Sequence, residues 1–503
     1  MGKKSSKHES VVPIKMILNG GVNFAQTPAN IADNECRRGH NFIYDPNTDY
    51  LVTRPGTDCV TASALANPIL NLHYYEKDAA HKYLVGASGG KLYYLDGTSW
   101  VEIGSLHDST TIPSFLTFNS KLIVADGGAD LNEWDGTTYA ATTTSPDGSA
   151  LCTINNRIVA NADSEKDSVY MTTTEVYNDW NTAGTALGIK CGYGDNMTVN
   201  GFGVFGTDLI VSKKGDSEKR LYRIDTSGAT PTNWKAEMLS SVNCAQNHKS
   251  ITAAYNNIFF ADSNGFKAVK GVESYGDLQV DPVGKKINSV FTSGNNCDFV
   301  TYLPAYNAIW TGMGERIFCY TERLNASGSI VPAFTDIAFK WGRCRAICQA
   351  GDVVYLAGHN GYLYKLDETL STDETAPSTT STYPSILRTK TLMFGSDGIL
   401  RKLQFYLRPK ASGTGYLYCY KDEETPVNMK TVTLTPGGDC LYDATGDLAD
   451  ATGDLYDDGY YAWVETTRNR VRSGQMAFEI YLSSGRVGVE WVQAEIAQVE
   501  GGE

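Results

Sequence analysis

The sequence predicts an all-β protein, namely a β-propeller of about seven blades followed by an antiparallel β-sandwich-like domain. Three observations support this prediction. A strand–turn–strand pattern recurs through residues 66–366, its copies are spaced as propeller blades are, and residues 386–503 hold further short runs of alternating apolar and polar residues. No long stretch shows helical periodicity.

The clearest copy of the repeated pattern is a hairpin near residue 90. An apolar strand runs from Lys82 to Gly86, a Gly-rich turn follows, and a second strand runs from Lys91 to Asp96. Short strands separated by Gly, Asn, Ser or Asp are the sequence signal of a β-hairpin. Further copies begin at Lys121, Arg157, Asp208, Asn257, Asn307 and Asp352.

The spacing of these copies favours a propeller. Successive copies begin roughly 36 to 51 residues apart, and a blade of four antiparallel strands with its turns needs roughly 40–50 residues. Another strand precedes each copy, as Phe115–Phe118 precedes Lys121. Six or eight blades also fit this spacing, and a β-sandwich with coincidental spacing is the alternative fold.

The first 65 residues are expected to form an N-terminal arm with docking strands. Residues 1–12 are polar and basic and predict a flexible arm. Strands are expected at 14–18, 41–44 and 50–56, with a Gly-rich turn after the first of them. This block either docks on the propeller or closes it as an outer strand.

The chain beyond the propeller divides into two parts. Residues 367–385 are rich in Ser, Thr, Asp and Pro and predict a linker or a long loop. Residues 386–503 predict the separate sandwich-like domain. Its strands are expected at 386–394, 400–407, 415–420, 429–434, 460–464, 475–482 and 487–492. The first of these could instead supply the closing strand of the propeller.

Charge and cysteine content limit the class of protein. The chain has 503 residues and a formal charge of −14, from 43 basic and 57 acidic residues. Such a chain is poorly suited to gripping nucleic acid, although DNA could slide past its surface without sticking. The 11 cysteines are scattered without paired spacing, which favours reduced thiols and assembly in a cytoplasm. The polar N-terminus predicts neither a signal peptide nor a membrane span.

Two motifs resemble chemical sites but are better explained as structure. Gly86–Gly90 matches the G-x-S-x-G pattern of serine hydrolases, yet it leads into a strand and not into the helix which that nucleophile requires. Cys344 and Cys348 are expected on one face of a strand together with Ala346, as small core residues. A zinc site would need two further ligands, and no companion pair is visible.

Acidic residues are the other candidates for binding or catalytic sites. The tandem repeat within 443–458 predicts an exposed acidic loop, with calcium binding as the alternative. Asp96-Gly97 and Asp135-Gly136 predict tight turns, each followed by Thr. The acidic composition does not exclude a catalytic carboxylate pair of the glycosidase type, but no motif points to one. We therefore expect no enzyme and assign no catalytic, cofactor-binding or metal-binding residue.

Both ends of the chain resemble a known family. Gly20-Gly21-Val22-Asn23, Pro28, Asp33, Asn41 and Arg54-Pro55-Gly56 lie at one end, and Leu387–Lys390, Phe394-Gly395 and Arg401–Leu403 lie at the other. Together they resemble the tail nozzle proteins of short-tailed bacteriophages, also called tail tubular protein B or packaged-DNA stabilisation proteins. The resemblance covers the two ends and the general propeller plan. The chain has no clear counterpart of a distal gating loop.

The resemblance implies a structural protein of the virion tail, assembled in the host cytoplasm. It implies a homohexameric ring on the portal and adaptor stack, in contact with other tail proteins, with tail fibres as further candidate partners. Double-stranded DNA would pass through the lumen during ejection without specific binding. A carboxylate-lined lumen, which could include the 443–458 loop, is the accompanying hypothesis. The alternatives are a receptor- or carbohydrate-binding tail protein and a glycan-degrading propeller enzyme.

Overall fold

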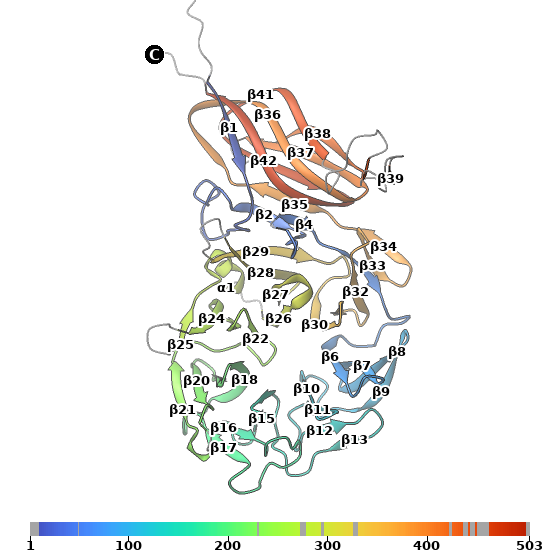
Figure 1. The fold of residues 1–503 in the computed structure, drawn as a ribbon, viewed down its shortest axis with the longest axis vertical. Helices are drawn as coiled ribbons and strands as arrows, with labels where there is room; N and C mark the ends of the chain where they lie inside the picture. The colour runs from blue at the N-terminus through green and yellow to red at the C-terminus, as the bar shows by residue number, and fades with distance from the viewer. Residues whose placement is uncertain are drawn as a thin grey trace, which may run out of the picture.

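The computed structural model describes residues 10–48, 50–228, 231–271, 278–292, 296–324, 330–421, 425–435, 441–442, 448–449 and 462–498. β-Strands dominate this part of the chain (Figure 1). The helical elements found in it are short: η1 (Pro231–Asn233), η2 (Lys285–Ile287), η3 (Pro304–Tyr306) and α1 (Asn288–Thr292). None of these has the length and apolar character that crossing a membrane requires.

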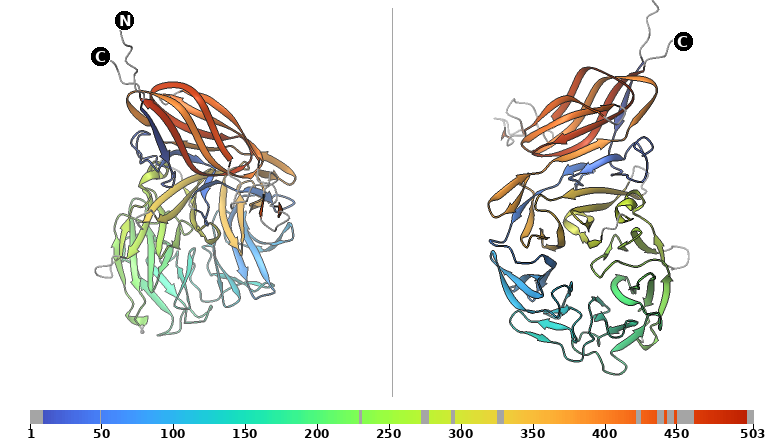
Figure 2. Two further views of the ribbon diagram at one scale, coloured as in Figure 1. Left: turned by 45° about the horizontal axis from the view of Figure 1, so that its top comes forward. Right: turned by 180° about the vertical axis from the view of Figure 1, so that it is seen from behind.

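Seven blades, each built around antiparallel strands, fan around one axis within the described residues (Figures 1 and 2). Blade 1 contains β6 (Ile69–Glu76), β7 (Lys82–Ser88), β8 (Lys91–Asp96) and β9 (Ser99–Ser105). Blade 2 contains β10 (Ser114–Phe118), β11 (Lys121–Ala125), β12 (Asn132–Trp134) and β13 (Tyr139–Ala141). Blade 3 contains β14 (Leu151–Ile154), β15 (Arg157–Asn161), β16 (Ser168–Met171) and β17 (Leu187–Lys190).

The next three blades follow the same order. Blade 4 contains β18 (Thr198–Phe205), β19 (Asp208–Lys214), β20 (Lys219–Asp225) and β21 (Ala236–Ser240). Blade 5 contains β22 (Ile251–Ala254), β23 (Asn257–Asp262), β24 (Gly265–Gly271) and β25 (Leu278–Asp281). Blade 6 contains β26 (Cys297–Leu303), β27 (Ala308–Met313), β28 (Arg316–Leu324) and β29 (Ile330–Ala338).

The predicted propeller is therefore confirmed, and the repeated pattern in the sequence marks the second strand of each blade. The first strands line the axis, and each contacts the first strand of the next blade until β30 of blade 7 meets β6 of blade 1. In blades 2 to 7 the turn between the first and second strands uses left-handed residues, as at Asn155 and Asn156 (φ 49° and 55°). Asn tolerates this conformation, which suits two-residue hairpins.

Blade 7 is closed by a strand from the beginning of the chain. It contains β30 (Cys344–Ala350), β31 (Val353–Gly358) and β32 (Leu363–Asp367), and then β5 (Gly56–Cys59) as the fourth strand. β5 pairs antiparallel to β32, with Cys59 opposite Tyr364. Of the two roles expected for the N-terminal block, closure by an outer strand is thus observed.

The expected linker at 367–385 is wrong as a description of this segment. It forms the hairpin of β33 (Thr372–Ala376) and β34 (Thr379–Thr382), which extends blade 7 beyond β5. Ser and Thr are common in loops, but Thr also suits a strand. The buried side chain of Asp373, with 0% exposure, fixes this hairpin against the propeller, and composition does not reveal that contact.

The C-terminal domain sits on the rim of the ring beside blades 6 and 7 (Figure 2). Its strands are β35 (Ser385–Thr389), β36 (Leu392–Ala411), β37 (Gly413–Lys421), β38 (Thr425–Leu434), β41 (Ala462–Leu482) and β42 (Arg486–Gln498). A small hairpin, β39 (Leu441–Tyr442) and β40 (Leu448–Ala449), lies in the same region of the chain. All pairings among these strands are antiparallel.

Two pairs of predicted strands are fused in this domain. The strands expected at 460–464 and 475–482 are both part of β41, and those at 386–394 and 400–407 overlap in β36. β41 pairs with β36 along most of its length and with β37 at its end. The polar run between the two predicted strands lacks apolar alternation, but its backbone still pairs with β36.

The N-terminal block connects the two domains. β1 (Ser10–Met16) pairs with β42, so residues 10–12 of the expected arm belong to a strand, and residues 1–9 lie outside the described part. β2 (Cys36–His40) lies between β29 of blade 6 and β35. β3 (Phe42–Tyr44) pairs with β4 (Leu51–Thr53), which pairs with β42. One hydrogen-bonded sheet therefore runs from blade 6 into the C-terminal domain.

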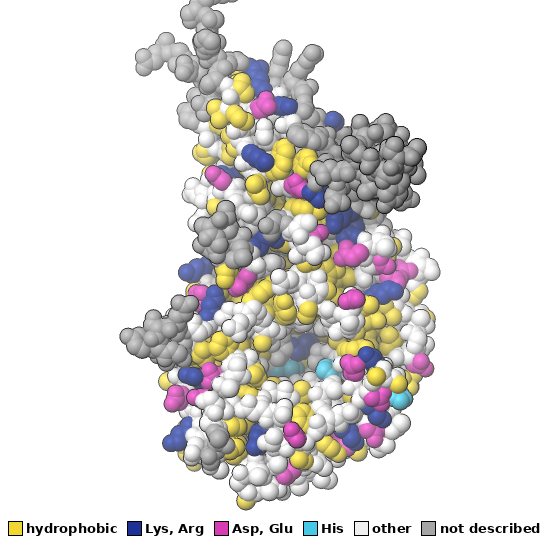
Figure 3. Space-filling model, viewed as in Figure 1, with side chains coloured by type: hydrophobic (Ala, Val, Ile, Leu, Met, Phe, Trp, Pro, Cys, Tyr) yellow, Lys and Arg dark blue, Asp and Glu magenta, His cyan; other side chains and the backbone are white. Residues whose placement is uncertain are grey.

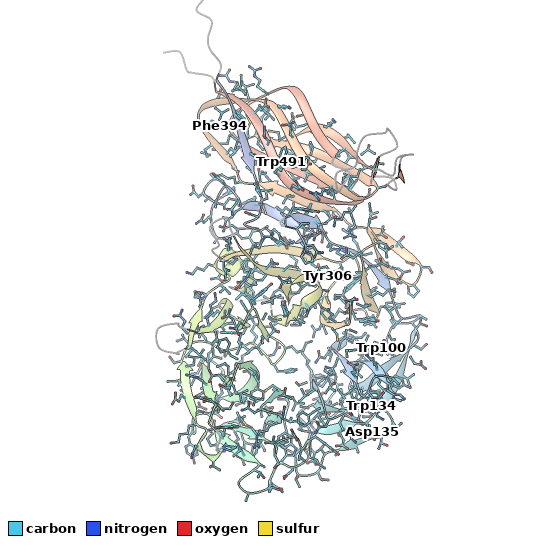
Figure 4. The ribbon with its side chains drawn as sticks, in the orientation of Figure 1. Trp100, Trp134, Asp135, Tyr306, Phe394 and Trp491 are labelled. Atoms are coloured by element: carbon cyan, nitrogen blue, oxygen red, sulfur yellow. The ribbon has the colours of Figure 1, made fainter. Side chains whose placement is uncertain are left out.

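Aromatic contacts join neighbouring elements in both domains. On β42, Trp491 stacks on Tyr406 with ring centroids 5.2 Å apart, and the Lys15 ammonium of β1 lies 4.7 Å from the centre of the indole (Figure 4). In blades 1 and 2, Trp134 packs against Tyr83 with centroids 5.0 Å apart. These contacts fix β1 to the C-terminal domain and blade 1 to blade 2.

Candidate functional site

The G-x-S-x-G motif lies where the hairpin prediction places it. Gly86 and Ser88 are in β7, and the turn is made by Gly89 and Gly90, with φ of 57° and 77°. The Ser88 hydroxyl donates to the carbonyl of Asn67 at 2.9 Å. The hairpin is confirmed, and this serine stands in a strand–turn–strand, without the elbow that a hydrolase nucleophile needs.

The expectation that Cys344, Ala346 and Cys348 share a face is wrong. β30 has an irregularity between Cys344 and Ala346. Cys344 packs in the same core cluster as Ile347, whereas Ala346 and Cys348 belong to the cluster on the other side. A bulge shifts side-chain alternation by one residue, which sequence periodicity does not show. No group of His, Cys, Asp or Glu in the described residues is arranged to hold a metal.

The two Asp-Gly turns are confirmed. Gly97 follows Asp96 in the β8–β9 turn with φ of 59°. The Asp135 carboxylate (Figure 4) accepts the backbone N–H groups of Thr137 and Thr138 at 2.9 and 2.7 Å. These bonds lower the pKa of Asp135. The acidic loop at 443–458 lies outside the described residues apart from the pair in β40.

The propeller axis is crossed by side chains from the segment before β22. The Lys249 ammonium donates to the carbonyls of Leu70 in blade 1 and Arg345 in blade 7, at 2.5 and 2.8 Å. The Asn247 amide donates to the Cys297 carbonyl in blade 6 at 2.9 Å. A bond from blade 5 to blade 1 must cross the interior of a seven-bladed ring. The central hollow of Figure 3 accordingly has basic and histidine side chains on its floor.

Charged groups concentrate at this crossing. Asp298 in β26 pairs with the Arg343 guanidinium at 2.7 and 2.8 Å and with Arg345 at 3.1 Å. Burial lowers the pKa of the Lys249 ammonium to about 8, opposed by the nearby charge of Asp298. Burial also lowers the pKa of His248 to about 4, and this ring donates to the Pro113 carbonyl. The cluster therefore joins five blades at the axis.

A second cluster of buried polar groups lies at the joint between the propeller and the C-terminal domain. Its centre is Arg54, which follows β4 and has 0% exposure. The guanidinium makes a bidentate ion pair with Asp373 at 2.8 and 2.6 Å. It lies 3.6 Å from the ring centre of Tyr383 and 4.6 Å from that of Phe339. Planar stacking with bidentate pairing is the environment that suits Arg over Lys.

Asn41 completes this joint. It has a left-handed backbone (φ 59°) and its side-chain oxygen accepts Arg54 Nε–H and the Ala338 N–H at 3.1 and 2.9 Å. Its amide donates to the Pro384 carbonyl at 2.7 Å. One residue thus touches the end of blade 6 and the segment that enters β35. The sequence singled out Asn41 and Arg54 only through the resemblance, and it gave no signal for Asp373.

The residues of the resemblance from the two chain ends also contact one another. The Lys390 ammonium pairs with Asp33 at 2.6 Å. The next residue, Thr391, lies just outside the motif and donates its N–H to the Pro28 carbonyl at 3.0 Å. Gly21 (φ 71°) lies against blade 6, where a Cβ would stand 2.4 Å from the Phe334 nitrogen. Asp33 and Lys390, one from each motif set, therefore lie against each other in the folded chain.

Comparisons with known proteins give no family. No family model matches the chain, and no curated protein matches it. Among solved structures it is similar to BamB from Moraxella catarrhalis, with 15% identity, a TM-score of 0.38, and coverage of 64% of this chain and 92% of that one. The N-terminal domain of Nup159 shares 11% identity with a TM-score of 0.37, and the match covers 65% of this chain and 98% of that one. The Dos1 propeller shares 10% identity with a TM-score of 0.37, and the match covers 62% of this chain and 94% of that one. These TM-scores are low, so the fold assignment rests on the sheet topology.

Proposed function

We propose that this protein is a structural subunit of a bacteriophage tail and forms a nozzle ring, the distal conduit through which the genome is retained and ejected. One observation carries the proposal. Motif residues that resemble short-tailed phage nozzle proteins come from both chain ends and meet in the ion pair of Lys390 with Asp33, while Asn41 and Arg54 of the same motifs bond to one another beside the segment that enters β35. A shared joint gives the degenerate motifs a common physical role.

The crossed propeller axis supports a conduit between subunits. Lys249 bridges blade 5 to blades 1 and 7, so a DNA duplex has no room to pass through one propeller. The duplex would instead run along the axis of a ring of several copies. Cyclic assembly also covers strand edges at the seams between subunits.

The charge of the chain suits this passive role. The formal charge of −14 gives the chain a net repulsion from the phosphate backbone of DNA. Its partners would be further copies of itself, the portal and adaptor, other tail proteins and, as a further candidate, tail fibres. Assembly would take place in the host cytoplasm. A cryo-EM map of the ring with a predominantly basic lumen would contradict a carboxylate-lined wall.

The mass and symmetry of the assembled particle test the proposal. Native mass spectrometry with two-dimensional classification of particles is expected to give six copies of the 54.8 kDa chain. The same particle should not retard duplex DNA in a gel at low salt, where any basic face would bind most strongly. Three copies would favour a receptor-binding tail protein, and a stable monomer that cleaves glycans would favour an enzyme.

A further inference from the structure

The propeller axis holds a positively charged group of side chains that the proposed function does not use. The Asp298 carboxylate of β26 keeps two guanidinium groups side by side, since it accepts from Arg343 at 2.7 and 2.8 Å and pairs with Arg345 at 3.1 Å. The Lys249 ammonium lies against the same strand as Arg345 and donates to its carbonyl at 2.8 Å. Three positive charges and one negative charge leave this axial cluster with a net charge of +2.

Backbone irregularities in the innermost strands place two members of the axial cluster. In four blades of the described chain the first strand carries one extra residue near its beginning, between Ile69 and Asn71, Val199 and Gly201, Cys297 and Phe299, and Cys344 and Ala346. In blades 6 and 7 the extra residues are Asp298 and Arg345. Their neighbours on both sides belong to the apolar clusters between blades, and these two residues do not. An extra residue of this kind re-aims a side chain, and such bulges are common beside functional sites.

The cluster has guanidinium nitrogens that a ligand can reach. Arg343 Nη1 and Arg345 Nη2 have no hydrogen-bond partner in the described part of the chain, and neither atom is shielded from solvent. The two side chains are 32% and 18% exposed, so their charges are partly withdrawn from water. Basic side chains stand on the floor of the central hollow (Figure 3). A partly desolvated pair of cations attracts an anion more strongly than the same pair on an open surface.

The geometry and the charge of the cluster select a phosphate dianion. A planar carboxylate has two oxygens and matches one guanidinium fork, whereas the oxygens of a phosphate point in several directions and accept from both guanidinium groups. A phosphate monoester carries a charge of about −1.5 to −2 near neutral pH, which balances the charge of the cluster. A phosphate diester, as in the backbone of DNA, carries a single negative charge and matches it less well.

We propose that the axial cluster binds a phosphate dianion, either free inorganic phosphate or the phosphate group of a small monoester. One phosphate oxygen accepts from Arg343 Nη1 and another from Arg345 Nη2. Lys249 contributes mainly its charge, because it already donates to the carbonyls of Leu70 and Arg345. Asp298 positions both guanidinium groups. The inference does not depend on assembly into a ring, since one chain supplies every group.

Isothermal titration calorimetry of the full chain, in phosphate-free buffer at neutral pH, tests this inference. The probes are inorganic phosphate, phenyl phosphate, dimethyl phosphate and acetate. We expect one or both of the first two to bind, and dimethyl phosphate and acetate to bind at least about tenfold more weakly, the effect of losing one charge-assisted hydrogen bond. Tighter binding of phenyl phosphate identifies a monoester site, and tighter binding of inorganic phosphate identifies a site for the free ion.

Arg345→Gln removes one guanidinium from the cluster and should weaken binding of the better phosphate probe about tenfold or more. Arg223→Gln is the matched control. Arg223 also pairs with a carboxylate, that of Asp208 at 2.8 Å, and is 25% exposed, but it lies in β20, the third strand of blade 4. This control should bind the phosphate probe as the parent protein does.

A second variant keeps the test decisive if Arg345→Gln does not fold. Arg343→Lys retains the positive charge and can still pair with Asp298, but it loses the Nη1 donor and should also weaken phosphate binding. Unfolding temperatures measured alongside show which variants are folded. The inference is overturned if neither phosphate probe binds, if dimethyl phosphate or acetate binds as tightly, or if the folded cluster variants and Arg223→Gln have equal affinities.

Discussion

The guanidinium of Arg54 uses all five of its N–H donors inside the protein. Two go to Asp373, one to the side chain of Asn41, and two to the carbonyls of Pro55 and Ala338. A charge removed from water is tolerated only when such partners surround it. The Asp373 carboxylate in turn accepts the Thr57 hydroxyl at 3.1 Å, so the network reaches β5.

Replacing Arg54 should destabilise the whole protein. Arg54→Met leaves the Asp373 carboxylate buried without its partner, which should cost about 3–5 kcal/mol in the free energy of unfolding. Urea unfolding followed by circular dichroism measures this. Lys91→Met is the control, because the Lys91 ion pair with Glu102 lies at the surface and both side chains are nearly half exposed. If the two variants have equal urea midpoints, Arg54 does not stabilise the joint.

At the scale of elements, β5 is the latch of the propeller. In the sequence, blades 1 to 6 lie between β5 and its partner β32. In the fold, β5 pairs antiparallel to β32 and closes blade 7. The latch is tightly packed, because a Cβ on Gly56 would stand 2.2 Å from the Thr372 carbonyl oxygen and 2.7 Å from the Leu370 Cβ. β5, β32 and the β33–β34 hairpin therefore hold one another in place.

A methyl group at this latch should loosen it. Gly56→Ala forces β5 and the β33–β34 hairpin apart and should cost about 1–3 kcal/mol of stability, as overpacking usually does. Gly474→Ala is the matched control, since a Cβ there meets no atom within 4 Å. Hydrogen exchange read out by mass spectrometry should show faster exchange in β5 and β32 of Gly56→Ala only. Unchanged exchange in both strands would contradict the latch.

At the scale of the molecule, the propeller and the C-terminal domain share a core. One cluster of buried residues contains Phe259 of blade 5, Phe318 of blade 6, and Phe405 and Phe478 of the C-terminal domain. The hydrogen-bonded sheet from β29 through β2 and β35 runs across the same boundary. Neither domain buries its facing surface without the other.

The two domains should accordingly unfold together. Calorimetry of the intact chain should give one transition, because the shared core and sheet couple the domains. Arg54→Met should broaden this transition or split it into two, since it weakens the joint more than either core. The Lys91→Met control should keep a single transition. Two well-separated transitions in the parent protein would show that the domains are independent.

The sequence predicted the parts of the fold that repeat. The second strand of every blade was located from local apolar runs and Gly or Asn turns, and the turns at Gly89 and Gly97 lie where their residue types require them. The same local reasoning missed the β33–β34 hairpin, the fusion of two strands in β41 and the bulge beside Arg345. These features depend on pairing with distant segments, which periodicity does not encode.

The same distinction between local and long-range features applies to the candidate sites. The sequence by itself determined that strand pairs recur at blade spacing, because hairpins form between neighbours in the chain. Only the tertiary structure decided that Arg54 pairs with Asp373 and that Lys249 crosses the axis. Each of these depends on a buried polar group and a segment remote in sequence, so its energy is set by burial that no local pattern reveals.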